Sequence, residues 1–108
     1  MLDIESVVLD WVVSVQSMVV SIRRHDRALS EQLSRSSKAV ALNLSEGSGT
    51  MGGNKQRAFR VALGEMRESM TAIEIASRLG FVREPGESEI ARTRRIVGTL
   101  VNLAHPGR

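Results

Sequence analysis

Basic side chains are the residues with which this sequence is best equipped to bind a charged partner. The chain of 108 residues carries 15 basic and 12 acidic side chains, and Lys38 and Lys55 are its only lysines. The net charge of +3 indicates a mildly basic surface. Basic residues gathered on a helical face can neutralise phosphates. The candidates for nucleic-acid binding are Arg35, Lys38, Arg57, Arg60, Arg67 and Arg78.

The spacing of these candidates places most of them on one stripe. Arg60, Arg67 and Arg78 are separated by seven and eleven residues, which in a helix aligns them along one side. Arg57 lies near the same edge, and the first two candidates form an i, i+3 pair on the preceding helix. The pattern therefore predicts a basic stripe that can contact phosphates.

A solvated face neutralised by salt bridges is the alternative interpretation of the same residues. Glu74 shares the stripe, and Glu31 and Glu68 lie where they can pair with its arginines. The densest basic run, formed by Arg92, Arg94 and Arg95, is open to the same two interpretations. Composition alone does not decide between them, since an arginine-rich sequence also follows from a GC-rich genome.

A second group of polar residues is expected to form a structural hydrogen-bond network. Asn43 directly precedes the core position Leu44, so its amide is expected to be partly buried and to need partners. Gln32, Arg35 or the following helix can supply them. The predicted network joins the second helix to the third, and a ligand site is the alternative. Its residues are Gln32, Asn43, Glu46 and Glu68.

No set of residues in the sequence predicts catalysis. The two histidines, His25 and His105, lie at opposite ends of the chain and lack helical ligand spacing, and there is no cysteine. The segment GSGTMGGNK differs from a phosphate-binding loop because Asn54 precedes Lys55 and a helix precedes the loop. We therefore expect no enzymatic activity, no catalytic residue, no metal and no cofactor.

The elements that must position these side chains are helices. Hydrophobic residues make up 42 % of the chain but aromatic residues only 3 %, and the two prolines are Pro85 and Pro106. Glycine-rich residues 47–53 favour a reversal between two antiparallel helices. The chain is thus predicted to be one all-α domain, residues 1–108, folded as an antiparallel up-and-down four-helix bundle. The predicted helices cover approximately residues 4–24, 27–46, 54–79 and 87–104.

Helical periodicity also predicts which residues form the core. The expected inward residues of the first helix are Ile4, Val8, Trp11, Val15, Met18 and Ile22. Those of the third helix are Phe59, Leu63, Met66, Met70, Ile73 and Ala76. Those of the fourth helix are Ile90, Val97, Leu100, Val101 and Ala104.

The first helix carries a second apolar stripe, formed by Leu9, Val12, Val13, Val19 and Val20. Two stripes on one helix predict that it also contacts another subunit. Polar residues interrupt this helix, so a membrane span is not expected. Without a basic leader segment or cysteines, the sequence predicts a cytoplasmic protein.

The central residues resemble the four-helix bundle family described as 23S rRNA-intervening sequence proteins. That family's pattern is roughly a Gln, an Arg three residues on, Asn-x-x-Glu-Gly, a polar loop, an aromatic residue and Ala-x-Gly-x-x-x-Glu. The resemblance covers residues 29 to 82, but Ala39, Ala41 and Glu65 depart from the usual pattern. The matching residues are Gln32, Arg35, Asn43, Glu46, Gly47, Phe59, Ala62, Gly64 and Glu68.

The resemblance implies a bundle that assembles as a ring-shaped homopentamer. A related bundle is the accessory variability determinant of diversity-generating retroelements, to which this sequence is also similar. That protein is a basic pentamer that binds nucleic acid and a reverse transcriptase. The leading hypothesis is therefore a bacterial, non-enzymatic oligomeric scaffold that binds nucleic acid, RNA before DNA, as an accessory to another protein. A protein–protein adaptor without nucleic-acid affinity is the alternative. The sequence does not identify the partner or the biological process.

Overall fold

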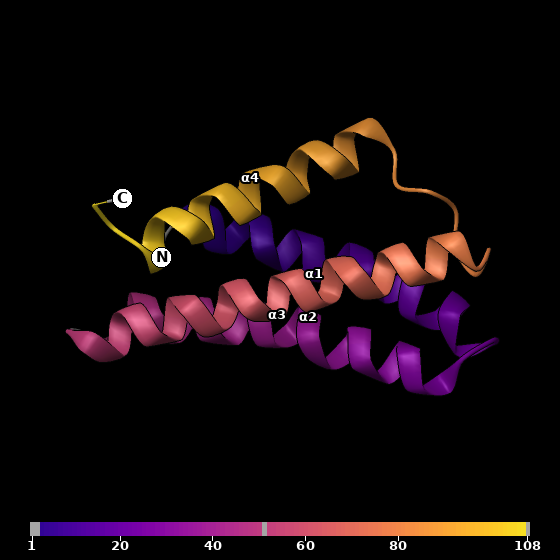
Figure 1. The fold of residues 1–108 in the computed structure, drawn as a ribbon, viewed down its shortest axis with the longest axis horizontal. Coiled ribbons are helices and arrows are strands. Elements are labelled where there is room, and N and C mark those ends of the chain that lie inside the picture. The colour runs from indigo at the N-terminus through magenta and orange to yellow at the C-terminus, as the bar shows by residue number, and fades with distance from the viewer. Residues whose placement is uncertain (1–2, 51, 108) are drawn as a thin grey trace.

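Within the residues that the structure describes, the chain folds into four antiparallel α-helices that run up and down in sequence order (Figure 1). This computed structural model describes residues 3–50 and 52–107. The helices are α1 (Asp3–Arg23), α2 (Arg27–Ser48), α3 (Gly53–Arg78) and α4 (Glu87–Ala104). The predicted all-α four-helix bundle is confirmed.

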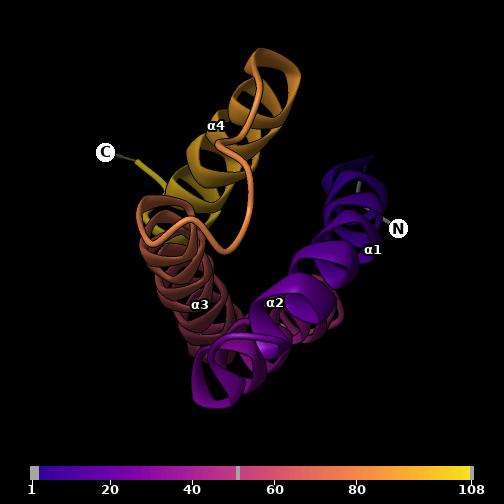
Figure 2. The same cartoon turned by 90° about the vertical axis from the view of Figure 1, so that its right-hand side faces the viewer.

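The helices surround one long core in their sequence order. Seen from the end, α2 lies between α1 and α3, and α4 lies beside α3 (Figure 2). The pair α2 and α3 packs most extensively, whereas α4 makes its closest packing with α3 and touches α1 less. Figure 1 shows why: α4 diverges from α1 toward its N-terminal end. The bundle is therefore less tightly closed between α1 and α4.

The core consists mainly of aliphatic side chains on the inner helix faces. Phe59, Leu33, Leu44 and Met66 are among its largest fully buried side chains. On α4 the periodicity prediction was partly wrong, since Ile96 is buried instead of Ile90. Met70 of α3 was also expected inside and is exposed. Ile90 and Met70 both line an open pocket where α4 diverges from α1, so the inward face there lacks a covering neighbour.

Local sequence signals account for both short connections at one end of the bundle. The side chain of Asp26 accepts a hydrogen bond from the backbone N–H of Leu29 at 2.9 Å and caps α2. Gly80 takes a positive φ of 78° after α3, and the N–H of Phe81 bonds the carbonyl of Ala76 at 2.8 Å. The ring of Phe81 stacks on His25 with centroids 4.6 Å apart. These contacts hold the α1–α2 turn against the start of the α3–α4 connection.

The joint between α2 and α3 differs from its prediction at Gly47. We expected α2 to end near residue 46, yet Gly47 lies within the helix and α2 continues to Ser48. A Cβ atom at Gly47 would lie 2.4 Å from Cε1 of Phe59. The missing side chain therefore makes room for the Phe59 ring, which is 1 % exposed. Gly52, at φ 71°, provides the left-handed residue in the connection.

Small polar residues allow α2 and α3 to approach closely. The hydroxyls of Ser36 and Ser69 lie 2.7 Å apart in a buried hydrogen bond between the two helices. Ser36 also donates to the carbonyl oxygen of Leu33 at 3.4 Å. Buried hydroxyls need such partners because water does not reach them. The pair fixes the register in which the outer faces of α2 and α3 lie beside each other.

Replacing Ser69 with alanine is expected to destabilise the fold by about 1 kcal/mol, since Ser36 loses its partner across the helix pair. Replacing both serines with alanine should cost less than the sum of the single changes, because no hydroxyl is then left unpaired. Urea unfolding of the three variants measures the coupling. Strictly additive losses would show that the hydroxyl pair contributes no shared interaction.

The outer face of α1 carries the apolar residues that the second stripe predicts. Val13 is 72 % exposed, Val20 57 % and Leu9 46 %. Val12 and Val19 are half-buried against the core. By length and composition α1 is also apolar enough to cross a membrane, which differs from the expectation, although its other face forms part of the bundle core. The outer stripe thus remains uncovered in the single chain.

Candidate nucleic-acid interface

The outer faces of α2 and α3 carry all six predicted phosphate-binding residues. Arg35 and Lys38 come from α2, and the four others come from α3. All six side chains are exposed. Because α2 and α3 pack side by side, the two helices present these residues on adjoining surfaces. What distinguishes the six is whether a carboxylate neutralises them.

Arg35 is neutralised by two glutamates from the neighbouring helix. Its Nη1 donates to Glu65 Oε2 at 3.0 Å, and its Nη2 pairs with the carboxylate of Glu68. The hydrogen bond and charge of Glu65, followed by the charge of Glu68, raise the pKa of the Arg35 guanidinium above its ordinary value. This ion-pair cluster stabilises the α2–α3 contact and leaves Arg35 poorly suited to a phosphate.

Arg78 is neutralised in the same way but within its own helix. Its Nε donates to Glu74 Oε2 at 2.8 Å, and this i, i+4 contact raises the pKa of the Arg78 guanidinium. Both side chains are well exposed, so the pair is screened by solvent. The salt-bridged alternative therefore describes Arg35 and Arg78. It also describes Arg27, whose Nε lies 3.4 Å from Glu31.

Four of the predicted residues have no carboxylate within salt-bridge distance among residues 3–50 and 52–107: Lys38, Arg57, Arg60 and Arg67. The three arginines are separated by three and seven residues on α3, so they form a row along its outer side. We call Arg57, Arg60 and Arg67 the arginine row. Lys38 adds a fourth exposed cation from α2.

Gly64 lies within the arginine row, between Arg60 and Arg67. It is exposed, and a Cβ atom there would meet nothing within 4 Å. The backbone of α3 is therefore bare at the centre of the row. A phosphate can approach the helix closely here while guanidinium groups contact it from both sides. This part of α3 therefore offers positive charge and an accessible surface to a phosphate, but no arrangement that recognises individual bases.

The polar network expected around Asn43 is not formed as predicted. Asn43 Nδ2 donates to the backbone oxygen of Ala39 at 2.8 Å, within α2, so its amide is satisfied by its own helix. Gln32 and Glu46 are exposed. Of the four predicted members, Glu68 reaches across to the neighbouring helix, where it binds Arg35. The polar side chains that connect α2 to α3 are thus those of the Arg35 ion-pair cluster and the serine pair.

Sequence reasoning missed Glu65 as part of this surface. Its carboxylate comes into contact with Arg35 because the antiparallel register of α2 and α3 aligns their middles. The small residues at 36 and 69 are the signal that could have indicated this register, since they face each other across the two helices. Glu65 lies three residues before Glu68, so both carboxylates reach the same edge of α3.

The basic run on α4 is divided among separate contacts. Arg95 Nη2 lies 2.8 Å from Asp3 Oδ2, and Arg92 Nη2 donates to Ser14 Oγ at 2.7 Å. Both contacts join α4 to α1. Arg94 forms no ion pair within the described residues. Arg92 and Arg95 therefore connect helices within the bundle, and the run does not continue the arginine row of α3.

This fold and surface define a small antiparallel four-helix bundle with an exposed basic face on α3. The family model described as 23S rRNA-intervening sequence protein matches residues 8–102, so the chain belongs to this family. A crystal structure of a protein of unknown function from the S23 ribosomal protein family of Bacteroides thetaiotaomicron has a similar fold, with a TM-score of 0.80 and 19 % sequence identity. The similarity covers 93 % of this chain and 96 % of that one. A search of curated protein sequences finds no match.

Proposed function

We propose that this protein is a non-enzymatic, homo-oligomeric scaffold that binds nucleic acid through its arginine row. RNA is the first partner to test, since the family to which the chain belongs is described by an intervening sequence of 23S rRNA. The observation that carries the proposal is the exposed row of Arg57, Arg60 and Arg67, to which Lys38 adds a cation. These groups are available to neutralise phosphates because no glutamate or aspartate of the described residues pairs with them.

Assembly is part of the proposal because one copy offers few contacts. A single row would bind weakly, whereas a pentamer with +3 on each chain repeats the row around a ring and carries +15. Repeated weak contacts on one strand give avidity without new interactions. The oligomer is thus the feature that turns a modest surface charge into useful affinity.

Binding of this kind is expected to tolerate sequence changes in the nucleic acid. The chain contains one tryptophan, two phenylalanines and no tyrosine, and Trp11 and Phe59 are buried. Base stacking therefore contributes little. Phosphate contacts should dominate, so the affinity should fall steeply as salt displaces the bound counterions. A reverse transcriptase or another protein partner stays a separate prediction.

A protein–protein adaptor is the second candidate. Exposed apolar residues on α2 and directly after α3 favour it, since Leu42 is 69 % exposed and Leu79 60 % exposed. The neutralised arginines Arg35 and Arg78 also take two charges away from a nucleic-acid surface. The adaptor needs no phosphate contact, so the two candidates predict different salt dependences.

Changing Arg60 and Arg67 together to glutamine should weaken binding to every RNA and duplex DNA tested. Because two phosphate contacts per engaged subunit are lost, the slope of log affinity against log salt should fall by about one for each lost contact. Fluorescence anisotropy with labelled RNA and DNA in a salt series measures both quantities. Circular dichroism should show unchanged helix content, since both side chains are exposed.

The matched control removes the same charge elsewhere. Arg23 and Arg24, at the end of α1, are exposed and unpaired within the described residues. Changing both to glutamine should leave the salt slope close to that of the parent. Equal losses in the two double variants would show that only net charge matters. If the parent does not bind at about 50 mM salt, where such contacts are strongest, the adaptor replaces the nucleic-acid scaffold.

A further inference from the structure

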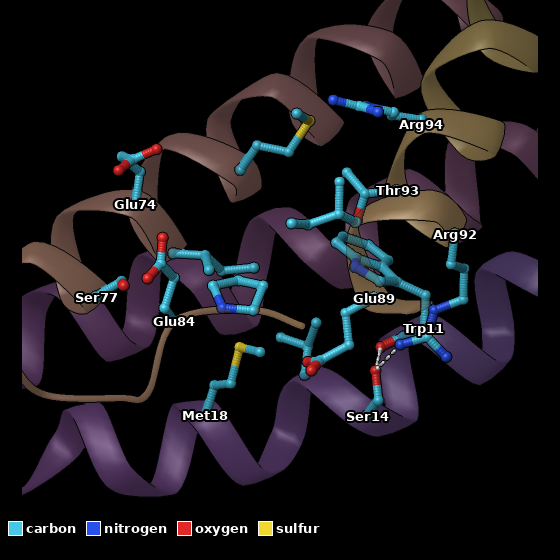
Figure 3. A pocket seen from close by; sticks show the side chains of 15 residues that line it. Trp11, Ser14, Met18, Glu74, Ser77, Glu84, Glu89, Arg92, Thr93 and Arg94 are labelled. Atoms are coloured by element: carbon cyan, nitrogen blue, oxygen red, sulfur yellow. Dashed lines mark hydrogen bonds between the residues drawn. The ribbon is translucent and has the colours of Figure 1, made fainter. Parts of the chain in front are cut away.

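The divergence of α4 from α1 leaves a pocket that the nucleic-acid interface does not use. Its volume is about 280 Å³, and α1, α3, α4 and the connection before α4 form its walls (Figure 3). This volume lies just below the range found for small-ligand pockets, about 300–1,000 Å³. The apolar lining residues are Trp11, Val15, Met18, Met70, Ile73 and Ile90, together with Pro85.

Arg94 and Arg92 both line this pocket, and Arg92 is the half-buried cation of the two. Its Nη2 donates to Ser14 Oγ at 2.7 Å, and Ser14 in turn donates to the backbone oxygen of Trp11 at 2.7 Å (Figure 3). Arg92 Nε is buried and has no acceptor among the described residues. A guanidinium carries five N–H donors, and the acceptor that Arg92 contacts is the neutral hydroxyl of Ser14. The half-buried side chain therefore has unused donors beside an apolar surface.

Carboxylates at the opposite side of the pocket limit the charge of a ligand. Glu74 and Glu84 line that side (Figure 3). Glu89 also lines the pocket, and its Oε1 accepts from the Gly86 N–H at 3.1 Å. This backbone hydrogen bond lowers the pKa of Glu89 below its ordinary value against the opposing effect of burial, and the contact with Arg83 and the charge of Arg92 lower it further. Three carboxylates around one pocket repel a ligand that carries several negative charges.

We propose that this pocket binds a small organic monocarboxylate with an aromatic or branched aliphatic body. The carboxylate pairs with Arg92, for which a planar anion with two oxygens is a suitable partner. The body packs between Trp11 and the flexible side chains of Met18 and Met70. Phosphate esters are disfavoured by the glutamates. This site is independent of the proposed nucleic-acid function, because it lies between α1, α3 and α4 instead of on the outer arginine row.

Trp11 allows a direct test because it is the only tryptophan in the chain. Titration of the full-length protein with 4-phenylbutyrate should change the tryptophan fluorescence in a saturable way, with a dissociation constant of about 1 mM or tighter. The positively charged analogue 4-phenylbutylamine and inorganic phosphate should give no saturable change. Equal responses to the acid and the amine would overturn the proposal, because Arg92 would then select nothing. No saturable response to the acid up to about 10 mM would overturn it as well.

Substitutions separate the ionic contact from the shape of the pocket. Arg92→Gln should raise the dissociation constant about tenfold or more, since a charge-assisted contact is lost. Ile90→Glu should abolish binding at an exposed position that the fold tolerates. Arg24→Gln, an equal change of charge outside the pocket, should bind like the parent. If Arg92→Gln keeps its helical circular dichroism and binds the acid as tightly as the parent, the proposed pairing is wrong.

Discussion

Gly47→Ala is expected to destabilise the protein by about 1–3 kcal/mol, although alanine is the better helix former. Gly47 lies inside α2 with helical neighbours, and an added Cβ would meet Cε1 of Phe59 at 2.4 Å and Cδ1 at 2.6 Å. The ring is buried in the close-packed core, so it cannot move aside without displacing its neighbours. Overpacking therefore exceeds the gain in helix propensity.

The matched control is Gly64→Ala, for which the opposite sign is expected. Gly64 also lies within a helix, yet a Cβ there meets nothing within 4 Å. Alanine should therefore stabilise α3 by about 0.5–1 kcal/mol through its higher helix propensity. Thermal unfolding of both variants at one protein concentration measures the contrast, with about 4–8 °C for each kcal/mol in a domain of this size.

A double variant identifies the cause of the Gly47 effect. Phe59→Leu opens space beside residue 47, and on its own it should destabilise the core. In the Gly47→Ala background the same change should cost less than in the parent, because it also relieves the clash. Additive losses would show that the Gly47 effect does not depend on the Phe59 ring. A neutral Gly47→Ala variant would show that the ring has room to shift.

These glycines illustrate which parts of the fold the sequence predicts. Asp26 and Gly80 act on their own helix ends, so the caps they form can be inferred from local residue types. Gly47 acts through Phe59, which lies on another helix, and reading it as a helix end was therefore wrong. Periodicity identified the helices correctly because each buries one broad apolar face.

The same distinction applies to the core and the candidate interface. Ile90 has the right periodicity for burial, but its own helix, α4, diverges from α1 and leaves it uncovered. The apolar stripe of one helix does not predict such a divergence between two helices. The arginine row could be predicted from spacing within α3. The neutralisation of Arg35 by Glu65 could not, since it depends on the register between two helices. Local charge patterns therefore predict a surface, and packing decides which charges stay available.

The outer stripe of α1 is the surface through which we propose that the subunits assemble. Val13 and Val20 are the most exposed apolar residues of this helix, and Leu9 continues the stripe. Contiguous apolar surface of this kind marks an interaction site more often than a free surface. The parent protein should accordingly form a closed oligomer, with five subunits as the expected number, in native mass spectrometry at micromolar concentration.

Changing Val13 and Val20 together to glutamate should convert this oligomer to monomers, because charges on both sides of a buried contact repel and lose their hydration. Leu79→Glu is the control, since it places one such charge on an exposed apolar residue directly after α3. The control should keep the subunit number of the parent. Circular dichroism should report helical bundles in all three proteins, because the inner face of α1 is unchanged. A parent that is monomeric at micromolar concentration, or a double variant that keeps its subunits, would remove α1 from the proposed assembly and with it the avidity on which nucleic-acid binding is proposed to depend.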